Sequence, residues 1–345
     1  MIRVKKEGII LEATKRKFEN DAVLNPACYQ DGNKVHMFYR AVQKGNKSTI
    51  GYCLLEGPLK VVHRNEQPVI VKEKKYESQG IEDPRIVKID DTFYLTYTAF
   101  DGKAACGAYA ISKDLKQFEK KGQLTPRLSY NEFRKFAGKD PKVNPKYFRF
   151  YEFYHMAKNL DKKIIVWDKD LVFYPRKINR KFTFLHRFRP DIQVVSVEKL
   201  SMLTKSFWRK YIENLKGNTL MHCTKQHELS YIGSGCPPIE TKEGWLIIYH
   251  GVTDGPEGFI YNACAALFDK KNIMKEIGRL KKPLFSPTEE WEINGDVRDV
   301  VFPTGTAIFN DRLYIYYGAA DKRIACASVN LKILLKELKK KSNMS

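Results

Sequence analysis

Hydrophobic and polar residues alternate in five segments that share one pattern. Each segment begins with a turn containing Asp, Asn or Gly, continues as an alternating aromatic strand, and ends at a small or polar residue. The segments are DGNKVHMFYRA at 31–41, DDTFYLTYTAF at 90–100, INRKFTFLHRF at 178–188, KEGWLIIYHGV at 242–252 and NDRLYIYYGAA at 310–320. Their first large apolar residues are 58, 89, 63 and 68 residues apart, which indicates five repeats of one structural unit.

The flanking residues extend each unit to three or four antiparallel strands. A strand rich in small residues follows, as in IGYCLLE and CGAYAIS, and a proline-bearing segment precedes, as in NPACY and EDPRIVKI. Such a sheet has two apolar faces, which it buries by stacking against similar sheets, and radial stacking closes into a ring. The pattern therefore predicts an all-β fold, a five-bladed β-propeller. A pair of β-sandwiches is the alternative, but it does not explain one motif at regular intervals.

Two segments fall outside this repeat. The long step of 89 residues marks an insertion at about 124–166, between the second and third blades, where we expect a helix or a long loop over one face. At about 330–341, apolar residues are spaced as on one face of a helix, with lysines around them. These apolar residues are Leu331, Ile333, Leu334 and Leu338. We expect a terminal amphipathic helix packed on a single propeller domain spanning residues 1–345.

The chain carries 61 Lys and Arg against 40 Asp and Glu, a formal net charge of +21. This charge is dispersed along the chain and is not gathered into one stripe with aromatic residues, so we expect no nucleic-acid partner. There is no run of eighteen apolar residues, and we expect no membrane span. The seven cysteines occur singly, without a CxxC pair, which argues against a disulfide framework.

The first residues, MIRVKKEGII, lack the apolar core of a signal peptide. We therefore expect a cytoplasmic protein if the chain is complete, and a periplasmic or secreted one if a signal peptide has been removed. The sequence contains no metal-ligand spacing and no dinucleotide fingerprint, so we expect neither a metal ion nor an organic cofactor. Whether the protein forms a homo-oligomer is left open.

The proline-bearing segments hold the same place in every unit, so their polar residues should meet near the propeller axis. These residues are Asn25, Asp83 with Arg85, Lys169 with Asp170, Glu240 and Asp299. Pro84 restricts the preceding Asp83 to an extended conformation, which would aim its carboxylate at the axis. Glu82 should then point to the opposite face. The alternative is that Asp83 only pairs with Arg85, two residues further on.

Two aromatic strands end in histidine and a neighbouring polar residue. They supply His186 with Arg187, and Tyr249 with His250. We interpret the two histidines as occupying equivalent places in two blades, which favours a ligand-binding site; a buried hydrogen bond is the alternative for each. Carboxylates, aromatics and basic groups that converge at one place favour sugar chemistry, in which Asp and Glu protonate a leaving oxygen and activate a nucleophile.

The segment GIEDPRIVKIDDTFYLTYTAFDG resembles the signature of glycoside hydrolase family 130, the mannoside phosphorylase and β-mannosidase family. Further similar segments are NPACY…MFYRA, KDLVFYPRKINRKFTFLHR, GSGCPPIETKEGWLIIYHGV and VVFPTGTAIFNDRLYIYYGAAD, which together cover most of residues 20–325. The resemblance implies a five-bladed propeller that cleaves β-mannosidic linkages of mannooligosaccharides with inversion. It also implies that an acid aspartate protonates the leaving oxygen through a hydroxyl of the mannosyl ring.

The same resemblance implies roles for individual residues. Asp83 falls on the position of the general acid. The positions of sugar- and anion-binding contacts are Asn25, Arg40 and Asp321, and those near the phosphate of phosphorylases are Lys169, Arg187, Tyr249 and His250. The expected substrate-binding set is completed by Arg85, Asp170 and His186.

Two positions depart from the phosphorylase pattern of the family. Thr49 stands where many phosphorylases carry a second arginine, and Glu240 stands where a phosphate-binding lysine is often found. A carboxylate there would repel phosphate and could act as the base for a water molecule. We therefore favour an inverting β-mannosidase with Asp83 and Glu240 as catalytic residues. The alternatives are a phosphorylase that uses inorganic phosphate and releases mannose 1-phosphate, and a non-catalytic propeller that binds glycans.

Overall fold

The computed structural model describes residues 2–158 and 164–340 of the chain. Residues 159–163 of the expected insertion and residue 341 of the expected terminal helix therefore lie outside the described part. Strands account for most of the regular structure, and this confirms the all-β class. Of the helices in the described part, none is both long and apolar enough to cross a membrane.

The strands form five antiparallel sets, which we number in chain order. Set one contains β2 (Ala22–Asp31), β3 (Lys34–Gln43), β4 (Lys47–Glu56) and β5 (Lys60–Arg64); set two contains β6 (Gly80–Ile89), β7 (Thr92–Phe100), β8 (Ala105–Ser112) and β9 (Glu119–Gln123). Set three contains β10 (Lys169–Phe173), β11 (Phe182–Arg187), β12 (Ile192–Val197) and β13 (Thr219–Met221). Set four contains β14 (Tyr231–Ser234), β15 (Ile239–Thr241), β16 (Gly244–Gly255), β17 (Gly258–Phe268) and β18 (Glu276–Arg279). Set five contains β19 (Val301–Phe309), β20 (Arg312–Ala319), β21 (Arg323–Asn330) and β1 (Val4–Leu11).

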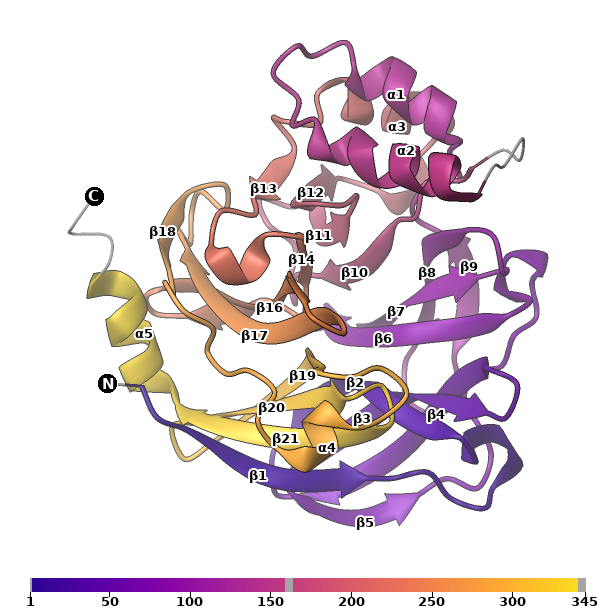
Figure 1. Ribbon diagram of the computed structural model, residues 1–345. Coiled ribbons are helices and arrows are strands. Elements are labelled where there is room, and N and C mark those ends of the chain that lie inside the picture. The colour runs from indigo at the N-terminus through magenta and orange to yellow at the C-terminus, as the bar shows by residue number, and fades with distance from the viewer. Residues whose placement is uncertain (1, 159–163, 341–345) are drawn as a thin grey trace.

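The expected aromatic strands are the second strands of sets one to three and five, and β16 of set four. Sets one and two share one sheet through a single parallel pairing of Ser48 with Gly80, while the other sets are separate sheets. Set five is completed by β1, which pairs antiparallel with β21 from Val4 opposite Val329 to Leu11 opposite Ile324. This pairing joins the two ends of the chain, and Figure 1 shows the five sets following one another around the molecule.

The hydrophobic core is divided among the contacts between neighbouring sets. Each of five buried clusters contains residues of two sets: one and two, two and three, three and four, four and five, and five and one. Representative pairs are Phe38 with Leu95, Val87 with Phe184, Leu185 with Trp245, Ile248 with Ile315, and Met37 with Tyr316. Every set thus contributes buried apolar residues to two clusters, which stabilises each sheet only in the presence of its neighbours.

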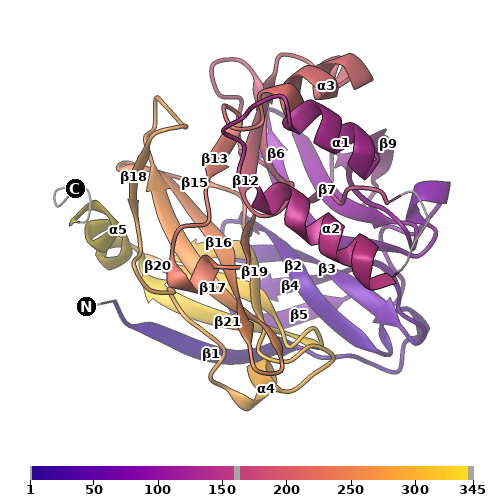
Figure 2. The same ribbon diagram turned by 45° about the horizontal axis from the view of Figure 1, so that its top comes forward.

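Helices are confined to the edges of this arrangement. The helices are α1 (Tyr130–Ala137), α2 (Lys146–Lys158), α3 (Lys205–Glu213), α4 (Glu290–Ile293) and α5 (Leu331–Lys340), with single 3-10 turns at Lys17–Glu19, Lys75–Glu77, Leu200–Met202 and Gln226–Glu228. The insertion forms α1 and α2, which lie at the same edge of the molecule as α3, and α1 packs beside α3, as Figures 1 and 2 show. Helix α5 is the expected terminal helix, but Ile333 is exposed and Leu335 takes its place on the buried face.

Four of the five sets contain the same buried contact between a tyrosine, a glutamate and a cation. The tyrosine hydroxyl of the aromatic strand donates to a fully buried glutamate, which also binds a Lys or Arg from the last strand of the set. The contacts are Tyr39–Glu19–Arg64, Tyr97–Glu77–Lys120, Tyr249–Glu228–Arg279 and Tyr317–Glu292–Lys6, with hydroxyl-to-carboxylate distances of 2.7, 2.7, 2.5 and 2.5 Å. Because each charge is paired and hydrogen-bonded, these groups remain buried at little cost and tie each set to the segment that precedes it.

Candidate active site

A small cavity lies where the first strands of several sets approach one another. Its volume is about 150 Å³, and it is bordered by the starts of β2, β6 and β10, by β19 and by the turn after β20. The lining residues are Asn25, Arg40, Asp83, Lys169, Asp170, Arg187, Arg189, Tyr261, Val297, Val300, Phe302 and Asp321. Seven of the residues expected from the sequence are therefore together: Asn25, Arg40, Asp83, Lys169, Asp170, Arg187 and Asp321.

Three of these residues reach the cavity through one repeated backbone feature. Asn25, Asp83 and Asp170 have φ values of 50°, 49° and 58°, in the left-handed region that Asn and Asp tolerate better than other residues with a side chain. At each of them the pairing with the next strand slips, which is a β-bulge. The expectation that Asp83 is extended before Pro84 is therefore wrong, because the bulge overrides the local preference.

The bulge brings two adjacent carboxylates to the same cation. The Asp83 carboxylate accepts a hydrogen bond of 2.7 Å from the amide of Asn25, and its Oδ1 lies 3.8 Å from a nitrogen of Arg40. Arg40 also donates to Glu82 at 2.9 Å, and Lys169 donates to the other oxygen of Glu82 at 3.2 Å. Glu82 and Asp83 were expected on opposite faces, and this is wrong because the alternation of a regular strand does not hold through a bulge.

The surroundings move the pKa values of the three cavity carboxylates in different directions. Burial acts to raise the pKa of Asp83, but Arg40, Lys169, Arg85 and the amide of Asn25 outweigh it, so the pKa is lowered. Burial raises the pKa of Asp170 against the opposing effect of Arg187. Burial also raises the pKa of Asp321, to about 6, although Arg40 opposes it. The cavity thus places Asp83, whose pKa is lowered, beside two carboxyl groups whose pKa values are raised.

Arg85 does not pair with the carboxylate of Asp83. Its guanidinium is buried and donates to the backbone oxygens of Asp83 at 2.9 Å, of Pro84 at 3.0 Å, and of Gly235 in set four. Arg85 is not among the residues that line the cavity. It therefore supports the bulge from behind and does not reach the cavity in which it was expected to bind substrate.

A second cationic group lies across the cavity. Arg187 is 3.1 Å from Asp170 and 3.1 Å from Nε2 of the buried His250. Burial, together with Arg187, Arg85 and Arg189, lowers the pKa of His250 well below its usual range, so that the neutral ring accepts a hydrogen bond from Arg187. His250 stands behind Arg187 and is not among the cavity-lining residues, so it acts on the cavity through that arginine.

His186 and Tyr249 do not reach the cavity, contrary to expectation. His186 is buried, with Nδ1 2.9 Å from Asp168 and Nε2 2.8 Å from the hydroxyl of Tyr211, while Tyr249 donates to Glu228. The cause is register: His186 is equivalent to Tyr249, and Arg187 is equivalent to His250. Successive strand residues point to opposite faces, so the two histidines are not equivalent and the first of each pair faces the core.

Glu240 lies outside the cavity. It lies on the short strand β15. Its carboxylate binds Arg176 at 2.7 and 2.9 Å and Lys270 at 3.0 Å. The hydrogen bond from Arg176 and the contact with Lys270 lower its pKa to about 2, against the effect of burial. A carboxylate so paired, and not facing Asp83, has no geometric support as the base of a hydrolase.

Three further lining residues, Arg189, Tyr261 and Phe302, stand outside the set expected from the sequence, and they come from three different places. Arg189 follows Arg187 by two residues, and its guanidinium lies 4.0 Å from the ring centre of Tyr231, to whose hydroxyl it donates at 3.1 Å. Tyr261 lies on β17, and Phe302 lies on β19. Arg187 and Arg189 are two residues apart, and such residues point to the same side of an extended chain. This spacing is the sequence signal for Arg189.

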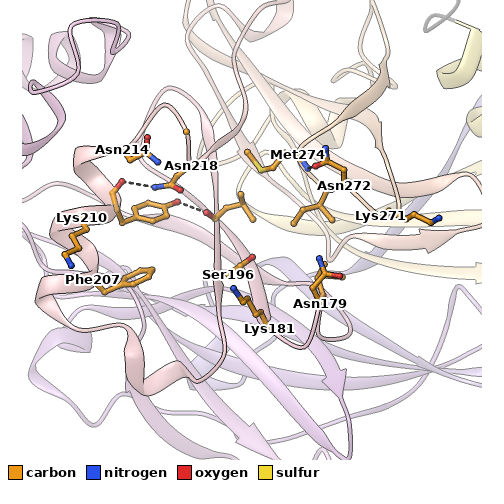
Figure 3. A pocket seen from close by; sticks show the side chains of 15 residues that line it. Asn179, Lys181, Ser196, Phe207, Lys210, Asn214, Asn218, Lys271, Asn272 and Met274 are labelled. Carbon is orange, nitrogen blue, oxygen red and sulfur yellow. Dashed lines mark hydrogen bonds between the residues drawn. The ribbon is translucent and has the colours of Figure 1, made fainter.

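A larger cleft lies elsewhere, between sets three and four (Figure 3). Its volume is about 680 Å³, and its polar side chains are mainly amides and amines, among them Asn179, Lys181, Lys210, Asn214 and Lys271. The cleft has no carboxylate among its described lining residues and none of the acid–base groups expected from the sequence. Within residues 2–158 and 164–340, no group of three or more His, Cys, Asp or Glu side chains is arranged to hold a metal ion.

Comparison with known proteins finds relatives over nearly the whole chain. The family model described as β-1,4-mannooligosaccharide phosphorylase, that of glycoside hydrolase family 130, matches residues 5–340. A 1,2-β-oligomannan phosphorylase from Thermoanaerobacter sp. (strain X514) is 30% identical, covering 96% of this chain and 99% of its own length. A β-1,2-mannobiose phosphorylase from the same organism is 32% identical, covering 95% of this chain and 97% of its own length.

The fold is also that of a solved structure. The β-1,2-mannobiose phosphorylase of Listeria innocua, in complex with β-1,2-mannobiose, superposes with a TM-score of 0.71 at 20% identity. The alignment covers 98% of this chain and 100% of the other. The match of the family model over nearly the whole chain, together with relatives at 30% identity or above, leads to one conclusion. The chain belongs to glycoside hydrolase family 130 and is a glycoside-processing enzyme.

Proposed function

We propose that this enzyme is a β-mannoside phosphorylase, which transfers a terminal mannosyl group to inorganic phosphate and releases mannose 1-phosphate. The observation that carries the proposal is the set of four cations, Arg40, Lys169, Arg187 and Arg189, that line the cavity with Asp83. Several charge-assisted donors are what a phosphate nucleophile needs. Two full-length relatives are phosphorylases of β-1,2-mannosides, and this linkage is the one we propose for the substrate.

Asp83 is the proposed general acid. Its proton passes to the leaving oxygen through a hydroxyl of the mannosyl ring, while a phosphate oxygen attacks the anomeric carbon from the opposite face and the glycosidic bond breaks. The anomeric configuration is thereby inverted. Asn25, Arg40 and Asp321, which surround Asp83, are the proposed contacts of the mannosyl group.

The phosphate also bears on the protonation of Asp83. The surrounding cations Arg40, Lys169 and Arg85 hold the pKa of Asp83 low, whereas an acid catalyst must carry a proton. A phosphate anion bound by Lys169, Arg187 and Arg189 would offset the charge of Lys169 and add negative charge near Asp83, so the pKa of Asp83 would rise. Phosphate in this proposal is both the nucleophile and the group that lets Asp83 take up its proton.

The five strand sets are proposed to be the blades of a propeller within one domain. The buried cluster between sets five and one supports closure of the ring, as does the pairing of β1 with β21. In this arrangement the first strand of each set lies nearest the axis, and the cavity lies at one end of it. The repeated bulges at Asn25, Asp83 and Asp170 then aim three polar side chains at a common point.

Hydrolysis, the activity favoured from the sequence, has less support than phosphorolysis. Its main argument was Glu240, which faces away from the cavity and is bound by two cations. The test is incubation with β-1,2- and β-1,4-mannooligosaccharides, with and without inorganic phosphate. Mannose 1-phosphate formed only with phosphate is the expected result. Free mannose released in the absence of phosphate would contradict the proposal, and no cleavage under either condition would favour a glycan-binding role.

A further inference from the structure

The size of the cavity limits what it can hold. About 150 Å³ is small beside the 300–1,000 Å³ that is typical of ligand pockets. The terminal mannosyl group and the phosphate therefore fill it, and the remaining sugars of an oligosaccharide must lie over the rim. A rim that binds them needs an exposed surface that suits a sugar ring.

Trp167 provides such a surface directly beside the cavity. It precedes β10 by two residues and remains 36% exposed, although tryptophan is a side chain that proteins usually bury to a large extent. The Nζ atom of Lys169, which lines the cavity, lies 5.2 Å from the centre of the Trp167 ring. The indole is thus in contact with Lys169, the same group that binds Glu82 next to Asp83.

The indole is held in place by contacts that leave part of it open. Its Nε1 donates to the backbone oxygen of Lys103 at 3.1 Å, and the ring of Phe100 meets it edge-on, with ring centres 5.9 Å apart. Its backbone N–H donates to the hydroxyl of Tyr151 on helix α2 at 3.3 Å. A side chain fixed in this way loses little conformational freedom when a ligand binds, which favours recognition.

We infer that Trp167 is the platform on which the leaving-group sugars of the oligosaccharide stack. The C–H groups on one face of a pyranose ring are partly positive and pack against the negative face of an aromatic ring. The inference rests on the proposed function, because it takes the sugar chain to leave the cavity past Lys169. It makes Trp167 a determinant of substrate length, with no part in the chemical step.

Steady-state kinetics of Trp167→Ala and Trp167→Phe test this role, with β-1,2-mannobiose and β-1,2-mannotriose as substrates. For Trp167→Ala, the KM for mannotriose should rise about tenfold, while the KM for phosphate and the kcat stay within about twofold of the unmodified enzyme. Trp167→Phe should recover most of the loss, because it retains an aromatic face. The matched control is Phe153→Ala, which removes a 72% exposed ring on helix α2 and should change none of these constants.

Two results would overturn the inference. The first is a mannotriose KM that does not change in Trp167→Ala. The second is a phosphate KM that rises as much as the sugar KM, because Trp167 would then only support Lys169.

Calorimetric titration of β-1,2-mannotriose into the Asp83→Asn protein separates this inference from the proposed function. Binding that weakens about tenfold when Trp167→Ala is added supports the platform even if the enzyme performs no phosphorolysis. Equal binding by the two proteins, or no binding by either, contradicts it.

Discussion

The amide of Asn25 donates a 2.7 Å hydrogen bond to the carboxylate of Asp83, from the equivalent bulge of the neighbouring strand set. Two repeats of one unit have thus diverged into a donor and an acceptor. The bond fixes the orientation of the Asp83 carboxylate and is among the interactions that lower its pKa. Substitutions at Asn25 or Asp83 should therefore change the activity of the site directly.

Replacing Asn25 by Asp should turn this donor into an acceptor. Two carboxylates at hydrogen-bond distance cannot both ionise, so the pair should share one proton and kcat/KM for phosphorolysis should fall by about 100-fold at pH 7. The pH dependence of kcat/KM between pH 5 and 8 will measure the change in the pKa values of this pair. The matched control is Asn46→Asp, at an exposed turn residue with a similar φ of 54°, and an equal loss in both variants would contradict the prediction.

Replacing Asp83 by Asn should remove the proposed acid while keeping the hydrogen bond with Asn25. We expect kcat to fall by about 10²–10⁴-fold, the range usual for loss of a general acid, with an unchanged melting temperature. Asp90→Asn, at an exposed turn with φ of 52°, controls for the substitution itself. An active Asp83→Asn enzyme would mean that the proton comes from elsewhere.

Glu240→Gln should leave the activity nearly unchanged. The carboxylate is bound to Arg176 and Lys270 outside the cavity, so kcat and the KM for phosphate should stay within about twofold of the unmodified enzyme. The loss of its ion pairs should lower the free energy of unfolding by at most about 1 kcal/mol. A large loss of activity with retained folding would restore Glu240 as a candidate base.

Asp321→Asn should change how stability depends on pH. In the folded protein the pKa of Asp321 is raised to about 6 from an ordinary value of 3.8. Its contribution to stability is therefore present below pH 3.8 and is lost as the pH rises through 6. We compare the unfolding free energies of the variant and the unmodified protein, measured with urea. The difference, variant minus unmodified, should be larger at pH 8 than at pH 4 by about 1–3 kcal/mol. An equal difference at both pH values would contradict this.

Tyr249→Phe should affect stability and not catalysis. The variant removes the hydroxyl that donates a hydrogen bond to Glu228. We expect the free energy of unfolding to fall by about 1–2 kcal/mol, with an unchanged KM for phosphate. Tyr97→Phe, which breaks the equivalent bond to Glu77, should behave in the same way. A rise in the phosphate KM for Tyr249→Phe alone would return Tyr249 to the phosphate site.

The features that repeat along the chain were the ones that could be predicted from sequence. The aromatic strands follow from period-two alternation, and the meeting of Asn25, Asp83 and Asp170 follows from their equivalent places in the repeat. Strand β1 and helix α3 carry no copy of the repeated motif, and neither was foreseen. Pairing of β1 depends on contacts with β21, more than 300 residues away, which no local pattern reveals.

Local rules failed where the backbone is irregular or the register matters. A proline rule placed Asp83 in an extended conformation, but tertiary contacts hold it at a positive φ. The expected equivalence of His186 and His250 was wrong by one residue. Neighbouring strand residues face opposite ways, so His186 faces the core and not the expected site. Glu240 was placed by motif position alone, and the ion pairs that turn it outward involve partners about 64 and 30 residues distant in the sequence.

The pairing of β1 with β21 has a consequence for folding and solubility. Without β1, the backbone N–H and C=O groups along one side of β21 would form an open edge, a template for pairing with another molecule. Folding intermediates in which this edge is still uncovered are then the species most exposed to aggregation. A tag or fusion that hinders the first eleven residues from docking should therefore lower the yield of soluble enzyme before it affects the distant active site.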